Sequence, residues 1–309
     1  MLSRAAENLY WMARYLERAE STARLIEMGQ RMALLPGSGG RTEWRSVIRT
    51  SGCEDYFEDV AVLNEAAVVR GLVLDSENPS SIHSCLARAR ANGKAVRTAL
   101  TQEMWEALND GWRRLELIDE ATARRDLPTL IDWVKAKAAT FRGAAETGML
   151  RNEGYDFLRI GGHIERADMT LRLLNVKYYV LLPETEVVGG GRDHHQWTSV
   201  LHALSAVRAF HHVYNGDYSP KRIADFVLLN EKFPRSVAFC YGQICLQLER
   251  LARSYGQRHE CHDSAQVALE RLQGLAIGEI FRDGLHDFVN DFIGFTARIA
   301  GEVSRAYHF

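Results

Sequence analysis

The chain has 309 residues, of which 46% are hydrophobic, so it can bury a large core and is expected to be globular. Its 38 Lys and Arg residues nearly balance its 40 Asp and Glu residues, and the net charge of -2 predicts no general attraction to nucleic acid or to an anionic membrane. The five cysteines form no Cys-x-x-Cys pair, which argues against a disulfide framework and against a cysteine-rich zinc site.

The first 20 residues interrupt their apolar positions with charges before the core of a signal peptide could form. Nowhere does the chain offer about 18 uncharged apolar residues in a row, the length that a membrane span requires. We therefore expect a cytoplasmic protein without a membrane partner.

The N-terminal segment has the periodicity of a long helix. Apolar residues recur every seven positions between Leu2 and Ala33, along the row Leu2, Leu9, Leu16 and Ala23. Bulky aromatic residues lie off this stripe, so we expect the helix to be enclosed on more than one side and to be central in the fold.

The rest of the chain also has helical periodicity and few signs of strand alternation, which predicts an all-α bundle of long helices. Proline and glycine end the first helix near residue 36, and Gly93 is expected to weaken or bend a later one. Helices are predicted over residues 54–69, 81–110, 126–150 and 153–182, then, after a loop at 183–195, over 195–214 and 219–231, with two long helices completing the chain.

One short pattern occurs twice, as YLERAESTARLIE at residues 15–27 and as HIERADMTLRLLN at residues 163–175. The offset of 148 is close to half the length of the chain. We therefore predict a single domain, 1–309, in which halves 1–150 and 151–309 are each built around a central Glu-Arg helix. The matched positions are Glu17 and Glu165, Arg18 and Arg166, Ala19 and Ala167, Thr22 and Thr170, and Arg24 and Arg172, with Glu20 matched by the similar Asp168.

The repeated charges have three interpretations. An unpaired buried charge costs several kcal/mol, so charges within an apolar helix are expected to pair across helices, and this is our leading interpretation. The second interpretation is a pocket that binds a ligand or a protein. The third is an active site, in which Glu17 or Glu165 would carry protons while Arg18 or Arg166 held an anionic group such as a carboxylate or phosphate. The further candidates for ligand binding are Glu20, Arg24, Asp168 and Arg172.

A metal site is a further alternative, because two helices that each offer two carboxylates could converge on a divalent cation. The Glu-x-x-His pattern of di-iron helices is absent, since His163 precedes Glu165 by two positions and points elsewhere. We predict no metal. Five further histidines lie close together in the sequence, namely His194, His195, His202, His211 and His212. We expect them to be surface or cap residues, and a metal or acid–base role is the alternative.

No GxGxxG, Walker A, GxSxG or HExxH pattern occurs, so we predict no cofactor for this chain. Several longer segments nevertheless resemble the bacterial alpha-E family of helical domains with a Glu-Arg motif. These segments are LSRAAENLYWMARYLERAESTARLIE at residues 2–27, SIHSCLARARANGKAVR at 81–97, FLRIGGHIERADMTLRLLNVKYY at 157–179 and IADFVLLNEKFPRSVAFC at 223–240.

The chain also departs from the family pattern. Ala91 replaces a carboxylate, and Gly161, Gly162 and His163 stand where the family tends to have Leu-Gly-Arg. The four residues of the two Glu-Arg motifs are retained.

The resemblance implies a partner protein for this chain, and it does not imply a reaction that the chain itself catalyses. Members of the family are typically encoded beside, or fused to, a circularly permuted ATP-grasp ligase, often with a transglutaminase-like protease or a proteasome-like hydrolase nearby. We therefore expect an accessory or substrate-binding subunit of a system that forms peptide or amide bonds, with ATP and magnesium held by the ligase. The alternative is an enzyme that uses the paired Glu and Arg residues for acid–base or transfer chemistry.

Overall fold

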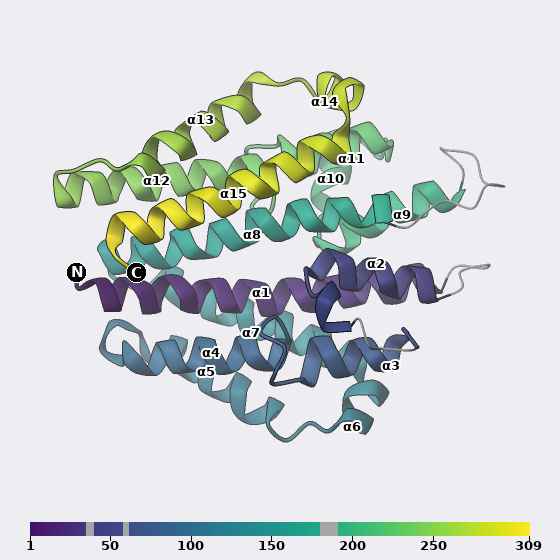
Figure 1. Cartoon of the computed structure of the whole chain (residues 1–309), viewed down its shortest axis with the longest axis horizontal. Helices are drawn as coiled ribbons and strands as arrows, with labels where there is room; N and C mark the ends of the chain where they lie inside the picture. Colours follow the sequence, from purple (N-terminus) through teal and green to yellow (C-terminus); the bar gives the residue numbers. More distant parts are fainter. Residues whose placement is uncertain (35–39, 58–61, 180–190) are drawn as a thin grey trace.

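The computed structural model describes residues 1–34, 40–57, 62–179 and 191–309, and every regular element among them is a helix. The predicted all-α class is therefore confirmed (Figure 1). The predicted N-terminal helix is also confirmed, as the 31 residues of α1 (Ser3–Ala33).

The helices that follow α1 differ widely in length, from 4 to 27 residues. After α1 come α2 (Arg41–Ser51), α3 (Glu65–Val68), α4 (Ile82–Ala95), α5 (Gln102–Leu115), α6 (Glu120–Arg125) and α7 (Leu127–Gly148). The chain continues with α8 (Glu153–Tyr179), α9 (Gly191–Ala203), α10 (Val207–Tyr214), α11 (Pro220–Leu228), α12 (Val237–Tyr255), α13 (Glu260–Gly274), α14 (Ile277–Asp283) and α15 (Leu285–Tyr307). Short 3-10 turns span Glu54–Phe57 and Arg97–Ala99, and a π-helical stretch spans Val69–Leu74.

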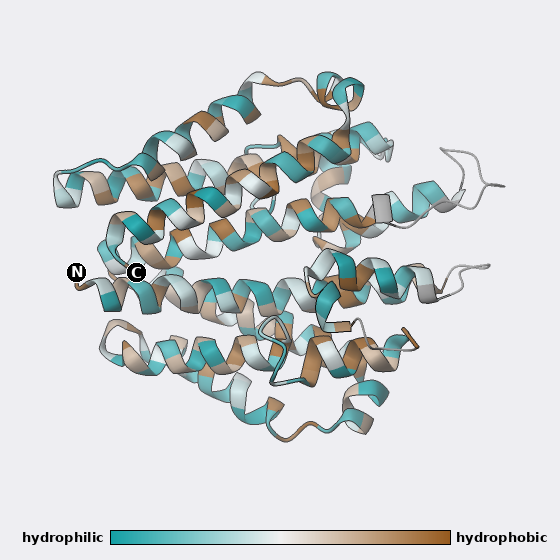
Figure 2. Ribbon diagram, in the orientation of Figure 1, coloured by the Kyte–Doolittle hydropathy of each residue, from teal (hydrophilic) through white to brown (hydrophobic). Residues whose placement is uncertain are grey.

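The two helices that carry the repeated pattern, α1 and α8, lie side by side in the middle of the molecule (Figure 1). They run in the same direction and approach closely at Gly161, where a Cβ atom would lie 2.3 Å from the carbonyl oxygen of Tyr10. α1 also packs on α4 and α7, while α8 packs on α12 and α15. Both helices carry hydrophilic residues among hydrophobic ones (Figure 2), so polar side chains enter the interior.

The single helix predicted over residues 54–69 is wrong. Residues 54–57 form a 3-10 turn, and α3 begins only after Asn64, whose side chain accepts a hydrogen bond from the backbone N–H of Ala67. This cap starts a new helix because it satisfies a donor that the first turn leaves free.

The helix predicted over residues 81–110 is two helices, and the break is not at Gly93. α4 ends at Ala95, and α5 begins after Thr101, whose hydroxyl caps the backbone N–H of Met104. Gly93 instead gives α4 a close contact, because a Cβ there would lie 2.8 Å from the side chain of Leu108.

The C-terminal part is more divided than predicted. The loop expected at 183–195 ends earlier, since α9 begins at Gly191, while residues 183–190 lie outside the described residues. Four helices, α12 to α15, follow where two were predicted. Gly256 (φ +68°) and Gly284 (φ +111°) take positive φ values that end α12 and separate α14 from α15.

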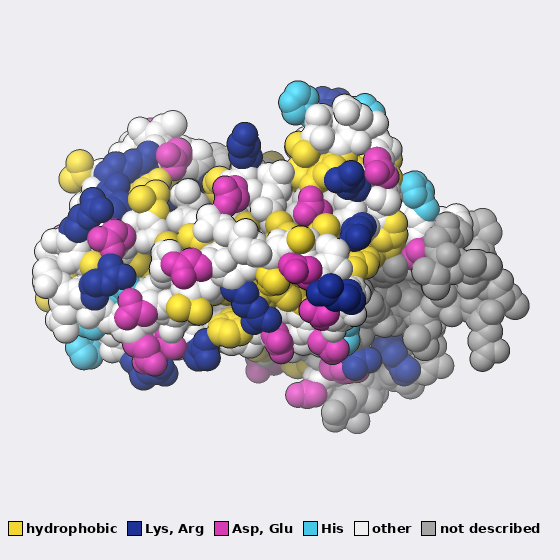
Figure 3. Space-filling model, turned by 90° about the horizontal axis from the view of Figure 1, so that it is seen from above, with side chains coloured by type: hydrophobic (Ala, Val, Ile, Leu, Met, Phe, Trp, Pro, Cys, Tyr) yellow, Lys and Arg dark blue, Asp and Glu magenta, His cyan; other side chains and the backbone are white. Residues whose placement is uncertain are grey.

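Among the described residues, no helix has the length and apolar character needed to cross a bilayer. On the face seen in Figure 3, basic and acidic side chains are intermixed.

Candidate functional site

The two Glu-Arg motifs meet across the α1–α8 contact, and each glutamate binds the arginine of the other motif. Arg166 donates from Nε to Oε2 of Glu17 at 3.1 Å and from Nη2 to Oε1 of the same carboxylate. Arg18 donates from Nε to Oε1 of Glu165 at 2.5 Å and from Nη2 to Oε2 at 3.0 Å. The predicted pairing of these charges across helices is therefore observed, in a crossed arrangement.

A second arginine reaches each of the two glutamates. Arg14, one helical turn before Arg18, donates from Nε to Glu165 at 2.8 Å. Arg142 of α7 donates from Nη1 to Glu17 at 2.9 Å. Glu17 and Glu165 are 2% and 1% exposed, so each buried carboxylate is held by two guanidinium groups.

Glu20, which is fully buried, is the centre of a neighbouring group of ion pairs. Arg24 donates to it from Nη2 at 2.7 Å and Arg235 from Nη2 at 2.5 Å, and Arg142 binds its other oxygen. Arg24 also donates to the carbonyl oxygen of Ala203 at 2.7 Å, which ties α1 to the end of α9.

The remaining candidates, Asp168 and Arg172, form a separate pair along α8. Arg172 donates from Nε to Asp168 at 2.7 Å over one helical turn. Burial raises the pKa of Asp168 more than Arg172 lowers it. Of the eight candidate residues, six therefore belong to the ion pairs of Glu17, Glu20 and Glu165, while these two pair with each other.

The arginines keep the buried glutamates ionised. Burial alone raises the pKa of Glu17, but the attraction of Arg166 and Arg142 outweighs it and holds the pKa well below its usual value. The same balance, with Arg235 as the strongest attraction, lowers the pKa of Glu20 to about 2. The pKa of Glu165 is also lowered, because Arg18 and Arg14 outweigh burial.

The acidic residues do not converge on a metal position. The carboxylates of Glu17, Glu20 and Glu165 are turned to arginines, and no group of three His, Cys, Asp or Glu side chains in the described ranges is arranged to hold an ion. The two pairs, His194–His195 and His211–His212, lie at the start of α9 and the end of α10.

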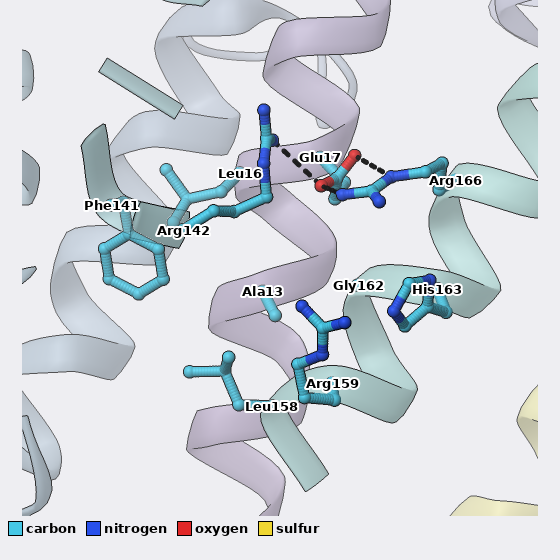
Figure 4. Close-up of a pocket in the computed structure, with 10 residues that line it drawn as sticks. All are labelled: Ala13, Leu16, Glu17, Phe141, Arg142, Leu158, Arg159, Gly162, His163 and Arg166. Atoms are coloured by element: carbon cyan, nitrogen blue, oxygen red, sulfur yellow. Dashed lines mark hydrogen bonds and ion pairs between the residues drawn. The ribbon is translucent and has the colours of Figure 1, made fainter. Parts of the chain in front are cut away.

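A cavity of about 30 Å³ opens beside the Glu17 ion pairs, between α1, α7 and α8 (Figure 4). Arg142 and Arg166 hold Glu17 on one side of it, and Arg159 and His163 of α8 line the other. His163 is 2% exposed. Burial, and then the nearby Arg166 and Arg159, hold its pKa well below the usual value, so the ring is neutral at pH 7.

Several members of the site were not identified from the sequence. Arg14 has a local signal, because it lies four residues before Arg18 and therefore on the same face of the helix. Arg142 has none, since it comes from α7. Arg235 lies in the family-like segment 223–240, in the turn before α12, but nothing in that segment indicates that it pairs with Glu20. Only the requirement that buried charges be paired predicts that such partners exist.

The buried Glu-Arg motifs differ from the other Glu-Arg dipeptides of the chain. The sequence Glu-Arg also occurs at residues 249–250 and 270–271, where the side chains of Glu249 and Arg271 are 41% and 39% exposed.

A family model named Alpha-E, described as a predicted alpha-helical domain with a conserved ER motif, matches residues 1–308. The chain belongs to the Alpha-E family.

The relatives of this Alpha-E chain are longer proteins. Uncharacterized proteins of Mycobacterium bovis and of two strains of Mycobacterium tuberculosis are each 22% identical to it, over 91% of this chain and 34% of the relative. The Alpha-E chain thus spans about a third of the length of the curated relatives that it matches. No solved structure matches it.

Proposed function

We propose that this Alpha-E chain is a non-catalytic helical subunit that binds or presents substrate for an ATP-grasp ligase forming peptide or amide bonds. The observation that carries the proposal is the state of Glu17 and Glu165. Each is ionised and bound by two arginines. A general base needs a pKa near the working pH and a free lone pair toward its substrate, so neither carboxylate is suited to that role.

Two further features support an accessory role. The matching relatives are about three times as long as the matched region, as expected of a module that works beside other domains. The segments that resemble the family imply that the partner is a circularly permuted ATP-grasp ligase, with a transglutaminase-like or proteasome-like hydrolase as a further member. The ligase would hold ATP and magnesium, and the use of ATP would place the pair in the cytoplasm.

The proposal is tested by co-expressing the chain with the ATP-grasp ligase encoded beside it. We expect the two to co-purify, and we expect ATP turnover or product formation by the ligase to change when this chain is added. Two proteins that neither associate nor affect each other's activity would refute the proposal.

An enzyme remains the second candidate, and one observation favours it. Neutral His163 lies in the same cavity as Glu17, so a proton acceptor and a charged pair are close together. This alternative predicts that Glu17→Gln and Glu165→Gln abolish an activity while thermal stability is largely unchanged. If both variants mainly lose stability, the structural role of the pairs is supported.

A further inference from the structure

The cavity beside Glu17 contains hydrogen-bond donors that the protein does not use. Nε of Arg159 is buried and has no hydrogen-bond partner among the described residues. Its only ion pair there is a loose one, 3.7 Å from Nη1 to Glu146. A guanidinium group is a planar fork of donors that matches a carboxylate, so Arg159 presents an unfilled site for an anion.

The second unsatisfied group is His163. Both ring nitrogens are buried, and neither has a hydrogen-bond partner in the described part of the chain. Leaving a buried donor without a partner costs free energy, and such groups in native proteins are usually satisfied by a water, an ion or a ligand. Figure 4 shows Arg159 and His163 on neighbouring turns of α8, with the Arg159 guanidinium between Ala13 of α1 and the His163 ring.

The local charge is also unbalanced. The carboxylates of Glu17 and Glu20 are bound by four guanidinium groups, those of Arg24, Arg142, Arg166 and Arg235, so two negative charges face four positive ones. Arg159 adds a further positive charge at the cavity. Burial, together with Arg24 and Arg166, outweighs Glu20 and lowers the pKa of Arg235 to about 10, as expected where positive charge is in excess.

Arg142 lies at the edge of the cavity, with its guanidinium group beside Glu17 and turned away from Arg159 and His163 (Figure 4). Both of its bonds to the glutamates use Nη1. Its side chain is 27% exposed and that of Arg159 is 22% exposed, so the two arginines lie on the solvent side of the cavity while His163 lies deeper.

The size of the cavity selects among anions. Its volume of about 30 Å³ is roughly twice the 10–15 Å³ that one water molecule needs on the same measure. Two oxygen atoms therefore fit in the enclosed space, as many as a carboxylate group has, whereas a tetrahedral sulfate or phosphate would leave two of its oxygens outside it. The carboxylate group of a larger molecule could enter while the rest of that molecule remained outside.

We propose that this cavity is a binding site for a carboxylate group, held by the guanidinium group of Arg159 and by an N–H of His163. The bound anion neutralises the excess positive charge and satisfies the unused donors. The proposal stands on these side chains and does not depend on the ligase partnership, so the two experiments can fail independently.

The test is an NMR titration of the full chain with labelled histidine rings, in which the His163→Gln variant identifies the His163 signals. Sodium acetate, sodium sulfate and sodium chloride are added in parallel at matched ionic strength. We expect acetate to shift the His163 signals with saturation, and sulfate and chloride to bind at least about tenfold more weakly. No saturable shift with acetate, or equal binding of sulfate or chloride, would overturn the proposal.

Two variants localise the effect. Among the described residues Arg159 makes a loose ion pair with Glu146 and a cation–π contact with the Tyr155 ring, 5.8 Å from its centroid. Because both are weak, Arg159→Gln should fold normally, and it should weaken acetate binding at least about tenfold. Arg253→Gln removes the same charge from a side chain that is 77% exposed and should leave acetate binding unchanged. Equal loss in both variants, or no loss in Arg159→Gln, would show that acetate does not bind in this cavity.

Discussion

Glu17 and Arg166, which lie 149 residues apart, are joined by two hydrogen bonds between α1 and α8. Arg18 and Glu165 are joined in the same way in the opposite sense. Because α1 and α8 run in parallel, this exchange of partners relates the two motifs by an approximate twofold rotation. The repeated sequence therefore forms two reciprocal ion pairs between the central helices, Glu17–Arg166 and Glu165–Arg18.

Removing one charge from these reciprocal ion pairs should lower the stability of the protein. Glu17→Gln leaves the buried guanidinium group of Arg166 without its carboxylate and removes one of the two carboxylates that bind Arg142. We expect the free energy of unfolding to fall by about 3–5 kcal/mol. Urea denaturation monitored by circular dichroism measures this loss.

The matched control is Glu249→Gln, which changes the same dipeptide where it is partly exposed on α12. There we expect a change within about 1 kcal/mol, since exposed ion pairs contribute little. Similar losses at Glu17 and Glu249 would contradict a special role for the buried pair.

The ion pair between Arg18 and Glu165 should also be measurable as an energetic coupling between the two residues. In a double-mutant cycle of Arg18→Gln and Glu165→Gln, the double variant should be more stable than the sum of the two losses predicts, by about 1–3 kcal/mol. Arg18→Gln leaves the buried Glu165 with Arg14 as its remaining ion-pair partner, Glu165→Gln leaves Arg18 without its carboxylate, and the double variant removes both charges. Pairing Glu165→Gln with the distant Arg253→Gln should give additive losses, and coupling of equal size there would refute the direct interaction.

The close approach of the two helices depends on one glycine. In Gly161→Ala the new Cβ would lie 2.3 Å from the carbonyl oxygen of Tyr10, a backbone atom that cannot rotate away. We expect a loss of about 1–3 kcal/mol or more, measured as a lower melting temperature.

The neighbouring Gly162→Ala is the control, because its Cβ would meet the side chains of Ala13 and Glu17 at an ordinary 3.9 Å. Alanine favours the helix by up to about 1 kcal/mol over glycine, so this variant should be as stable as the parent or slightly more stable. The reverse order of stabilities would mean that α1 and α8 do not approach closely at Gly161.

Lowering the pH should reduce the free energy of unfolding, because the same glutamates become protonated. The pKa of Glu20 in the folded state is about 2, below the usual value of about 4.3, and those of Glu17 and Glu165 are lowered too. A lowered pKa means that the unfolded chain takes up protons first, so the stabilisation is complete above about pH 5 and is lost as the pH falls toward 2.

Urea denaturation at a series of pH values between 7 and 3 measures this dependence. Glu165→Gln, which lacks one of the titrating groups, should lose less of its stability over that interval than the parent does. A free energy of unfolding that stays constant down to pH 3 would contradict the lowered pKa values.

Much of the helical architecture followed from local pattern. The seven-residue spacing of Leu9 and Leu16 predicted α1, because two turns of 3.6 residues return a side chain to the same face of a helix. The breaks between helices were harder to predict. α3 and α5 begin after side-chain caps at Asn64 and Thr101, and the apolar spacing on either side of each cap also fits one continuous helix. The division of the C-terminal part was missed for a similar reason, because glycines at positive φ end helices without a change in apolar spacing.

For the site, the sequence alone determined that a Glu-Arg helix occurs twice and that its buried charges need partners, because an unpaired charge in a core is too costly to retain. Only the tertiary structure decided which partners these are. Arg142 and Arg235 arrive from segments with no resemblance to the motif, and the exchange between Glu17 and Arg166 depends on the parallel contact of α1 and α8. Ion pairs act over a few ångströms in space, whereas sequence patterns reveal neighbours only along one helix.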